Sequence, residues 1–254
     1  MSNQTKQTAV DLLKVLETGD SKPYSNINPS KYIQHNLGVA DGLRGLDELL
    51  RRIPPDSVTV KTVRVFQDDD YVFVHSIYGF LGPTIVFDIF RFEDGQAVEH
   101  WDNVQGVAPA NPSGHSMIDG PTESKDHDKT ADNKALVRGF VEAILVNGKL
   151  EKLAGYFDGD NYTQHNPHIG DGLSGKVSAL EARAKQGITV KYDKIHMVLG
   201  EGDFVLVVSE GDFAGQPTSF YDLFRVAGGK IAEHWDTLET ILPQREWKNS
   251  NGKF

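Results

Sequence analysis

The stretch Glu99-His100-Trp101-Asp102 occurs twice in this chain, the second time as Glu233-His234-Trp235-Asp236. An Asp-aliphatic-Phe-Arg segment precedes each copy, as Asp88-Ile89-Phe90-Arg91 and as Asp222-Leu223-Phe224-Arg225. Further upstream a third block recurs: Tyr32, Gln34, His35, Asn36, Asp41, Gly42, Leu43 and Gly45 match Tyr162, Gln164, His165, Asn166, Asp171, Gly172, Leu173 and Gly175. Three matched blocks in one order, repeated after about half the chain, predict a duplicated domain rather than a solenoid of short repeats.

The composition is that of an ordinary globular protein, with 254 residues, 39% hydrophobic and 24% charged. This length suffices for two domains of about 100–150 residues, each with its own core. The formal net charge of -10 argues against nucleic acid or an anionic membrane as a partner, because both require clustered Lys and Arg. The chain has no cysteine, which excludes disulfides, a thiolate nucleophile and a zinc-thiolate site.

No apolar run approaches the ~20 residues needed to cross a bilayer. The first ten residues are polar and lack the apolar core of a signal peptide. We therefore expect a soluble, cytoplasmic protein that binds a small molecule, and neither nucleic acid nor a membrane.

The first half of the chain changes from a helical period to a period of two. Apolar residues at helical spacing predict helices over 5–17 and 43–52, and residues 31–36 are placed on a short helix or its exit. Alternation and β-rich composition predict four strands, over 58–65, 71–78, 83–92 and 97–102. Helices followed by an antiparallel meander indicate the α+β class.

The second half repeats this order after a segment rich in Pro and Gly. The predicted domains are residues 1–108 and 130–254, joined by a linker over 109–129. The short helix of the second copy is expected over 179–184, and the polar tail after Pro243 is expected to be loose.

Two pairs of aspartates flank the last hairpin turn of each half. Asp88 and Asp102 lie equally far from Gly95, and Asp222 and Asp236 lie equally far from Gly229. Residues equally far from the turn of an antiparallel hairpin lie opposite each other, at about 5 Å between backbones. Each pair of carboxylates is therefore expected on one face of its sheet, close together.

Alternation places His100 on the face of Asp102 and His234 on that of Asp236, and sends Glu99 and Trp101 to the opposite face. Two carboxylates and an imidazole beside a cavity would raise the pKa of one carboxyl, which suits a general acid or base. The alternative is a structural Asp–His or Asp–Arg network. The candidate catalytic residues are Asp88, His100, Asp102, Asp222, His234 and Asp236.

A second cluster is expected to bind substrate through hydrogen bonds to a carbonyl oxygen, or else to cap a helix. It consists of Tyr32, His35 and Asn36 in the first half and Tyr162, His165 and Asn166 in the second. His75 is a further substrate-binding candidate in the first half only, since Val208 stands at its place in the second, and it is alternatively a partly buried structural histidine. No pair of possible ligands has a recognisable metal-motif spacing, so we predict no metal.

The succession Tyr-x-Gln-His-Asn, Asp-Gly-Leu-x-Gly, Asp-x-Phe-Arg and Glu-His-Trp-Asp resembles the SnoaL-like branch of the NTF2-like (cystatin-like) superfamily. The resemblance covers both halves. It implies a curved antiparallel sheet wrapped around helices, with a pocket inside the cone. Family members are usually single domains that dimerise, so a fused pair resembles a built-in pseudo-dimer, and we expect Trp101 and Trp235 towards the interface between its two sheets.

The founding members of this branch are polyketide cyclases that close a ring by aldol chemistry without metal or cofactor. Their acid/base residue on the last strand matches Asp102 and Asp236. The place matched by Asp88 and Asp222 holds a histidine in the cyclases, so the cyclase substrate does not carry over. The resemblance implies a cofactor-independent acid/base enzyme of aldol cyclase, isomerase, dehydratase or hydrolase type, acting on a small carbonyl compound. The alternative is a non-catalytic ligand-binding or interaction module.

The two halves differ beside the expected cavity. The first half reads Val74-His75-Ser76-Ile77-Tyr78 where the second reads Val207-Val208-Ser209-Glu210-Gly211. We therefore expect two cavities of different shape and polarity, and favour the first as the more active.

Overall fold

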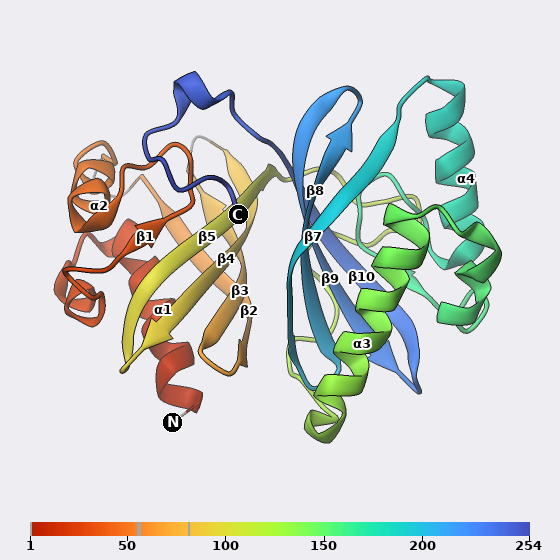
Figure 1. Cartoon of the computed structure of the whole chain (residues 1–254), viewed down its shortest axis with the longest axis horizontal. Helices are drawn as coiled ribbons and strands as arrows, with labels where there is room; N and C mark the ends of the chain where they lie inside the picture. Colours follow the sequence, from red (N-terminus) through yellow and green to blue (C-terminus); the bar gives the residue numbers. More distant parts are fainter. Residues whose placement is uncertain (1, 55–56, 81) are drawn as a thin grey trace. The chain divides into compact units, whose positions relative to one another are not determined.

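The computed structural model describes residues 2–54, 57–80 and 82–254. It divides into two compact units (Figure 1), of which the first consists of Met1–Gly106 with Ile241–Phe254 and the second of Val107–Thr240. Each unit contains one five-stranded sheet and its own helices. The prediction of a duplicated α+β fold is confirmed. The predicted packing of the two sheets as a pseudo-dimer stays a prediction.

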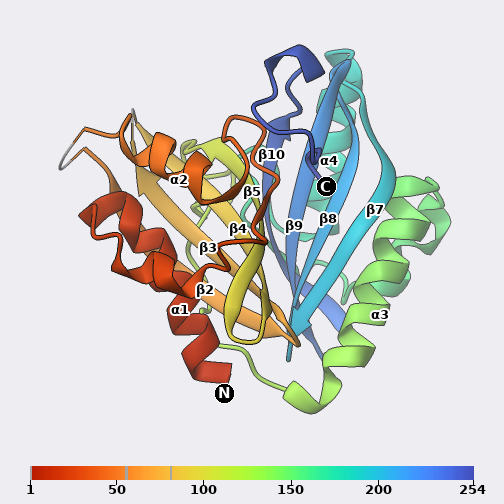
Figure 2. The same ribbon diagram turned by 60° about the vertical axis from the view of Figure 1, so that its left-hand side comes forward.

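The first unit begins with α1 (Ser2–Thr18), and α2 (Gly42–Leu50) follows later. Its sheet has the order β1-β5-β4-β3-β2 and is built from β1 (Ile33–Gln34), β2 (Thr59–Asp68), β3 (Tyr71–Gly79), β4 (Pro83–Glu93) and β5 (Gln96–Gly106). Leu12 and Leu13 of α1 pack with Val74 and Phe90 in one core. One face of the sheet is therefore covered by a helix (Figure 2).

The short strand β1 corrects the expectation of a helix over residues 31–36. It runs parallel to β5, with Gln34 opposite His100, whereas the other strand pairs are antiparallel. The backbone N–H of His35 donates to the carbonyl oxygen of His100 at 2.9 Å. Because this pairing joins segments far apart in the chain, no local sequence pattern predicts it.

The second unit repeats the arrangement. Its helices are α3 (Thr130–Phe140), continued by a π-helix over Val141–Val146, and α4 (Gly172–Lys185). Its sheet has the order β6-β10-β9-β8-β7 and is built from β6 (Thr163–Gln164), β7 (Val190–Glu201), β8 (Phe204–Phe213), β9 (Gln216–Ala227) and β10 (Lys230–Thr240). Helix α4 begins earlier than the predicted residue 179, because Asp171 with its extended backbone occupies the N-cap position.

A bulge sets which residues of β5 face the helices. Asp94 and Gly95 have φ of 49° and 79°, as in a two-residue type I′ turn, which would place Asp88 opposite Trp101 if pairing continued unbroken. The register shifts by one residue between Arg91 and Phe92, so that Asp88 lies opposite Asp102. The same shift in β10 places Asp222 opposite Asp236. The predicted register is confirmed, and the bulge that produces it also increases the local twist.

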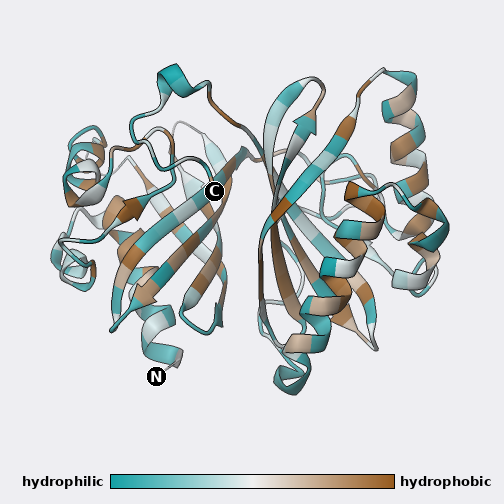
Figure 3. Cartoon of the chain, viewed as in Figure 1, coloured by the Kyte–Doolittle hydropathy of each residue, from teal (hydrophilic) through white to brown (hydrophobic). Residues whose placement is uncertain are grey.

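The tail over 241–254 belongs to the first unit, which corrects both its assignment to the second domain and the expectation that it is loose. Although Figure 3 colours most of it as hydrophilic, it is held by specific hydrogen bonds. The Asn249 side chain donates to the carbonyl oxygens of Asn36 and Val39, and that of Asn251 to the carbonyl oxygen of Gln34.

The predicted linker takes the corresponding place in the second unit. The Asn111 side chain donates to the carbonyl oxygens of Gln164 and Ile169. The Ser116 carbonyl oxygen lies 2.9 Å from His165 Nδ1, as the Gly252 carbonyl oxygen lies 2.9 Å from His35 Nδ1. The segment that follows the last strand of each repeat therefore packs in the other unit.

None of the helices in the described part of the chain combines the length and the apolar character needed to cross a membrane.

The repeated glycine of the Asp-Gly-Leu-x-Gly block is explained by a close approach of two backbone segments. A Cβ added to Gly45 would lie 1.7 Å from the Ala40 carbonyl oxygen, and one added to Gly175 would lie 2.2 Å from that of Gly170. We expect Gly45→Ala to lower the free energy of unfolding by about 2–4 kcal/mol in chemical denaturation, because the backbone must move. Gly106→Ala is the control, since its added Cβ meets no described atom within 4 Å. Equal stability of the two variants would contradict this explanation.

Candidate functional site

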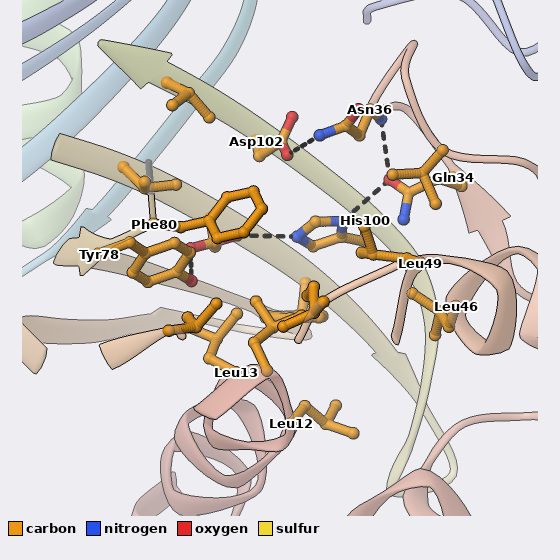
Figure 4. A pocket seen from close by; sticks show the side chains of 18 of the residues that line it. Leu12, Leu13, Gln34, Asn36, Leu46, Leu49, Tyr78, Phe80, His100 and Asp102 are labelled. Atoms are coloured by element: carbon orange, nitrogen blue, oxygen red, sulfur yellow. Dashed lines mark hydrogen bonds and ion pairs between the residues drawn. The ribbon is translucent and has the colours of Figure 1, made fainter. Parts of the chain in front are cut away.

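The first unit encloses a cavity of about 280 Å³ between its helices and its sheet, here called the first cavity. Leucines of α1 and α2, including Leu12, Leu13 and Leu46, form apolar walls. Polar side chains gather on the opposite side, where Figure 4 shows Gln34, Asn36, His100 and Asp102 pointing into the same space. Asp88 and Tyr78 complete this polar side. The predicted Asp–Asp–His cluster is thus brought together beside a cavity.

A chain of hydrogen bonds runs through His100. Its Nδ1 lies 3.0 Å from Gln34 Oε1, and its Nε2 lies 3.0 Å from Asp88 Oδ1. The hydroxyl of Tyr78 donates to Asp88 Oδ2 at 2.7 Å. Gln34 Oε1 also accepts from the backbone N–H of Asn36 at 2.8 Å, which identifies it as the amide oxygen.

This arrangement fixes the position of a proton. Because Gln34 Oε1 is an acceptor, His100 Nδ1 carries a hydrogen, so a neutral His100 has a lone pair at Nε2. Asp88 Oδ1 lies 3.0 Å from that nitrogen, so a hydrogen bond between them requires a hydrogen on one of the two groups. Burial raises the pKa of Asp88, and the hydrogen bond from His100 partly opposes the rise. The His100–Asp88 pair can therefore hold one proton inside the first cavity.

Asp102 stands in different surroundings, although it lies directly opposite Asp88. Its Oδ2 accepts a short hydrogen bond from the Asn36 side chain, and its Oδ1 lies 3.5 Å from Nζ of Lys253. Lys253 is only 4% exposed. The two groups are therefore at ion-pair distance in a buried place. No local motif predicts Lys253 here, because it comes from the tail.

The second unit encloses a smaller cavity of about 130 Å³, the second cavity. His234 again lies between two oxygens, at 2.9 Å from Asp222 Oδ1 and 2.9 Å from Gln164 Oε1. Tyr192 donates to Asp222 at 3.2 Å. The two cavities differ in volume and in their lining residues. The expected difference in shape and polarity and the choice of the first as the more active stay predictions.

The tyrosine that contacts the buried aspartate comes from a different strand in each unit. Tyr78 of β3 is paired with Val60 of β2, whereas at the matching pair of the second unit Tyr192 stands on β7 and Gly211 on β8. A Cβ on Gly211 would lie 1.9 Å from the Lys191 carbonyl oxygen. The tyrosine has thus changed strands while keeping its hydrogen bond to aspartate.

Asp236 lacks the cation that faces Asp102. Its Oδ2 accepts from Asn166 at 2.6 Å, but its buried Oδ1 has no hydrogen-bond partner among the described residues. In the sequence Met117 follows Ser116 as Lys253 follows Gly252, so a methionine stands at the matching place of the chain. Burial raises the pKa of Asp236, and the charge of Asp222 adds to the rise, against the effect of His234.

Three predicted histidines do not line the cavities. His35 lies on the opposite face of its sheet, where it stacks on Trp101 at 4.7 Å and contacts Glu99 at 2.9 Å. His165 repeats this with Trp235 and Glu233. Their placement beside Asn36 and Asn166 in the cavities is wrong, because consecutive residues of an extended segment point to opposite faces.

His75 is also on the opposite face, and its assignment to the cavity is wrong. It is buried against Phe87, at 4.2 Å between ring centroids, and its Nδ1 lies 3.2 Å from a guanidinium nitrogen of Arg64. Tyr78 lies three residues later on the same strand, so its side chain points to the other face and lines the first cavity.

The two tyrosines of the predicted substrate-binding cluster lie in different surroundings. Tyr32 lines the first cavity. Tyr162 is buried in the core of the second unit, where its hydroxyl accepts from the Gln164 side chain at 3.1 Å.

Two groups of three side chains in the second unit are close enough to share a metal ion. One consists of Asp222, His234 and Asp236 and the other of His115, Asp119 and His165. His115 and Asp119 belong to the predicted linker and were not anticipated as candidates. The expectation of a site without metal or cofactor stays a prediction.

No family model matches the chain, and no curated protein matches it significantly in sequence. Several solved structures do match. One is IdmH, a putative polyketide cyclase from Streptomyces antibioticus, with 19% identity, coverage of 40% of this chain and 92% of that chain, and a TM-score of 0.35. Another is an NTF-2 like protein of unknown function from Burkholderia xenovorans, with 13% identity, coverage of 43% and 89%, and a TM-score of 0.38.

An LEH-like epoxide hydrolase from M. tuberculosis is similar at 24% identity, with coverage of 44% of this chain and 85% of that chain and a TM-score of 0.33. Each of these matches spans less than half of this chain.

The raised pKa of Asp236 predicts a pH dependence of stability. The folded state holds this proton more tightly than the unfolded state, so the resulting stabilisation is present below about pH 4 and is lost as the pH rises through the folded pKa. Asparagine has no proton to lose, so the original chain should lose this stabilisation between about pH 4 and about pH 8 and Asp236→Asn should not. Measured with urea, the free energy of unfolding of Asp236→Asn minus that of the original chain should therefore increase over this range.

Asp102→Asn is the matched control for this experiment. It should be destabilising near neutral pH, because Lys253 loses its carboxylate partner. A difference between Asp236→Asn and the original chain that does not change with pH would refute the assignment.

Proposed function

We propose that the first cavity is the site of a cofactor-independent acid/base reaction on a small carbonyl compound. The observation that supports this proposal is the contrast between two carboxylates that lie opposite each other in the sheet. Asp102 Oδ1 lies 3.5 Å from the Lys253 ammonium, whereas Asp88 Oδ1 lies 3.0 Å from His100 Nε2 and burial raises the pKa of Asp88. Two carboxyl groups in such different surroundings can take the separate roles of base and acid.

In the proposed reaction the carboxylate of Asp102 removes a proton from the carbon next to the carbonyl group. Negative charge then develops on the carbonyl oxygen. Burial raises the pKa of Tyr78 well above its ordinary value, so its hydroxyl stays protonated and can donate to this oxygen in place of Asp88. The proton held by the His100–Asp88 pair is then available to the oxygen or to a leaving hydroxyl.

The walls of the cavity define the substrate class. They are largely aliphatic and aromatic, and the polar groups stand on one side. A cavity of about 280 Å³ suits an apolar ketone of two or three fused rings, with its carbonyl directed at Tyr78 and Asp102. Aldol closure, isomerisation and dehydration all begin with this proton transfer, so the proposal covers the common step.

Exchange of the α-protons of a ketone tests this proposal directly. With β-tetralone in D₂O, followed by proton NMR, we expect the chain to accelerate exchange and Asp102→Asn to slow it by about 10²–10⁴-fold, because the general base is lost. Asp236→Asn is the matched variant in the other unit and should leave most of the rate.

The contrary outcomes are separable. Loss of exchange in Asp236→Asn alone would transfer the reaction to the second cavity. Binding of β-tetralone in ligand-observed NMR, with no exchange above the rate in buffer, would support the alternative of a non-catalytic binding module.

Lys253 provides a second, independent prediction. Lys253→Met introduces the residue that stands at the matching place of the second unit, Met117. We expect Lys253→Met to slow β-tetralone exchange, because the ammonium group that lies 3.5 Å from Asp102 Oδ1 and holds this carboxylate in place is gone. Arg245→Met, which removes an exposed charge from the same tail, should leave the rate unchanged. Equal rates for the two variants would remove Lys253 from the mechanism.

A further inference from the structure

The second cavity contains an amine that has no counterpart in the first. Lys176 of α4 follows Gly175 as Leu46 of α2 follows Gly45, and both side chains line their cavities. A lysine therefore stands where the first cavity has an apolar wall. The Asp-Gly-Leu-x-Gly block is kept in both halves, and the residue that follows it changes from leucine to lysine.

The ammonium group of Lys176 has one contact with the fold, over the Phe140 ring at 5.5 Å from its centroid. Within the described ranges it forms neither a hydrogen bond nor an ion pair. Burial lowers the pKa of Lys176, and Arg183 acts in the same direction, whereas Asp222 and Asp236 oppose it. A lysine in an apolar pocket with a lowered pKa has a larger neutral fraction, and the neutral amine is the nucleophile.

A proton donor lines the same cavity. Asp236 is 7% exposed, and its Oδ1 has no hydrogen-bond partner among the described residues. The burial that raises its pKa keeps it protonated to a higher pH than an ordinary aspartate. An amine and a carboxylic acid in one cavity are the two groups that condensation with a carbonyl compound requires.

We propose that Lys176 forms a Schiff base with a small aldehyde or ketone in the second cavity, with Asp236 as its proton donor. The amine nitrogen bonds to the carbonyl carbon and loses a proton, and the carbonyl oxygen becomes a hydroxyl. Asp236 then gives its proton to this hydroxyl, the C–O bond breaks, water leaves and an iminium ion remains. The Asp236 carboxylate can afterwards take a proton from the carbon next to the iminium.

The size of the second cavity limits the substrate. At about 130 Å³ it has less than half the volume of the first cavity, so the carbonyl compound is smaller than the fused-ring ketone proposed there. This inference concerns a separate cavity and a covalent step, and it stands or falls independently of the proton transfer assigned to Asp102.

Reductive trapping tests the Schiff base. The full chain is incubated with benzaldehyde and sodium cyanoborohydride near neutral pH, digested with a glutamate-specific protease and analysed by mass spectrometry. Cleavage after Glu181 separates Lys176 from Lys185, an exposed lysine of the same helix that serves as internal reference. We expect labelling of Lys176 to be clearly faster than that of Lys185, because a lowered pKa leaves a larger neutral fraction of the Lys176 amine. Equal rates at the two lysines would overturn the proposal.

Matched variants make the assignment specific. Lys176→Leu restores the residue type of the first unit and should remove the fast label while leaving that of Lys185. Lys176→Arg keeps the charge, cannot form a Schiff base and replaces the leucine variant if that one does not fold. Asp236→Asn should slow the label at Lys176 at least about tenfold without changing Lys185. An unchanged rate in Asp236→Asn would overturn the role of the acid. Exchange of β-tetralone protons should be unaffected by Lys176→Leu.

Discussion

One extra residue in the last strand of each sheet determines what the cavities contain. The tight turns after β4 and β9 would pair each aspartate with a tryptophan, and a shift of a single residue restores the Asp–Asp pairing. Since side chains alternate between faces, a slip of one residue exchanges the whole set on one face for that on the other. His100 and Asp102 therefore face the helices, while Glu99 and Trp101 bind His35 on the reverse side. The repeated four-residue motif serves both faces at once.

The two units share this strand register and differ in the position of the lysine at the cavity. In the first cavity the lysine arrives from the tail and lies against Asp102. In the second that place is taken by methionine, and a different lysine, Lys176, approaches from α4 without a carboxylate at ion-pair distance in the described part of the chain. The two units thus keep the same strand order and differ in the element that brings a lysine to the cavity.

The sequence predicted what local rules control. Composition and alternation were enough for the strands and for placing His100 on the same side as Asp102. The opposition of Asp88 and Asp102 was predicted from a turn centred on Gly95, whereas in the structure a bulge produces it. They failed where distant segments meet. His35 was misplaced because the pairing of β1 with β5 is not encoded locally, and Lys253 and Tyr192 reach the aspartates from elements that share no motif with them. A side chain that reaches the site from a tail or from the far edge of a sheet cannot be predicted from the periodicity of the sequence around the site.

The crossing of the segments that follow β5 and β10 has a consequence for the order of synthesis. A ribosome completes all strands of the first unit before it begins α3, yet residues 241–254, which bind β1 and place Lys253 beside Asp102, are made only after the whole second unit. The first unit can therefore acquire its final contacts only once translation has passed residue 253. A nascent or truncated chain would carry Asp102 without its cation, so maturation of the first site is tied to production of the second.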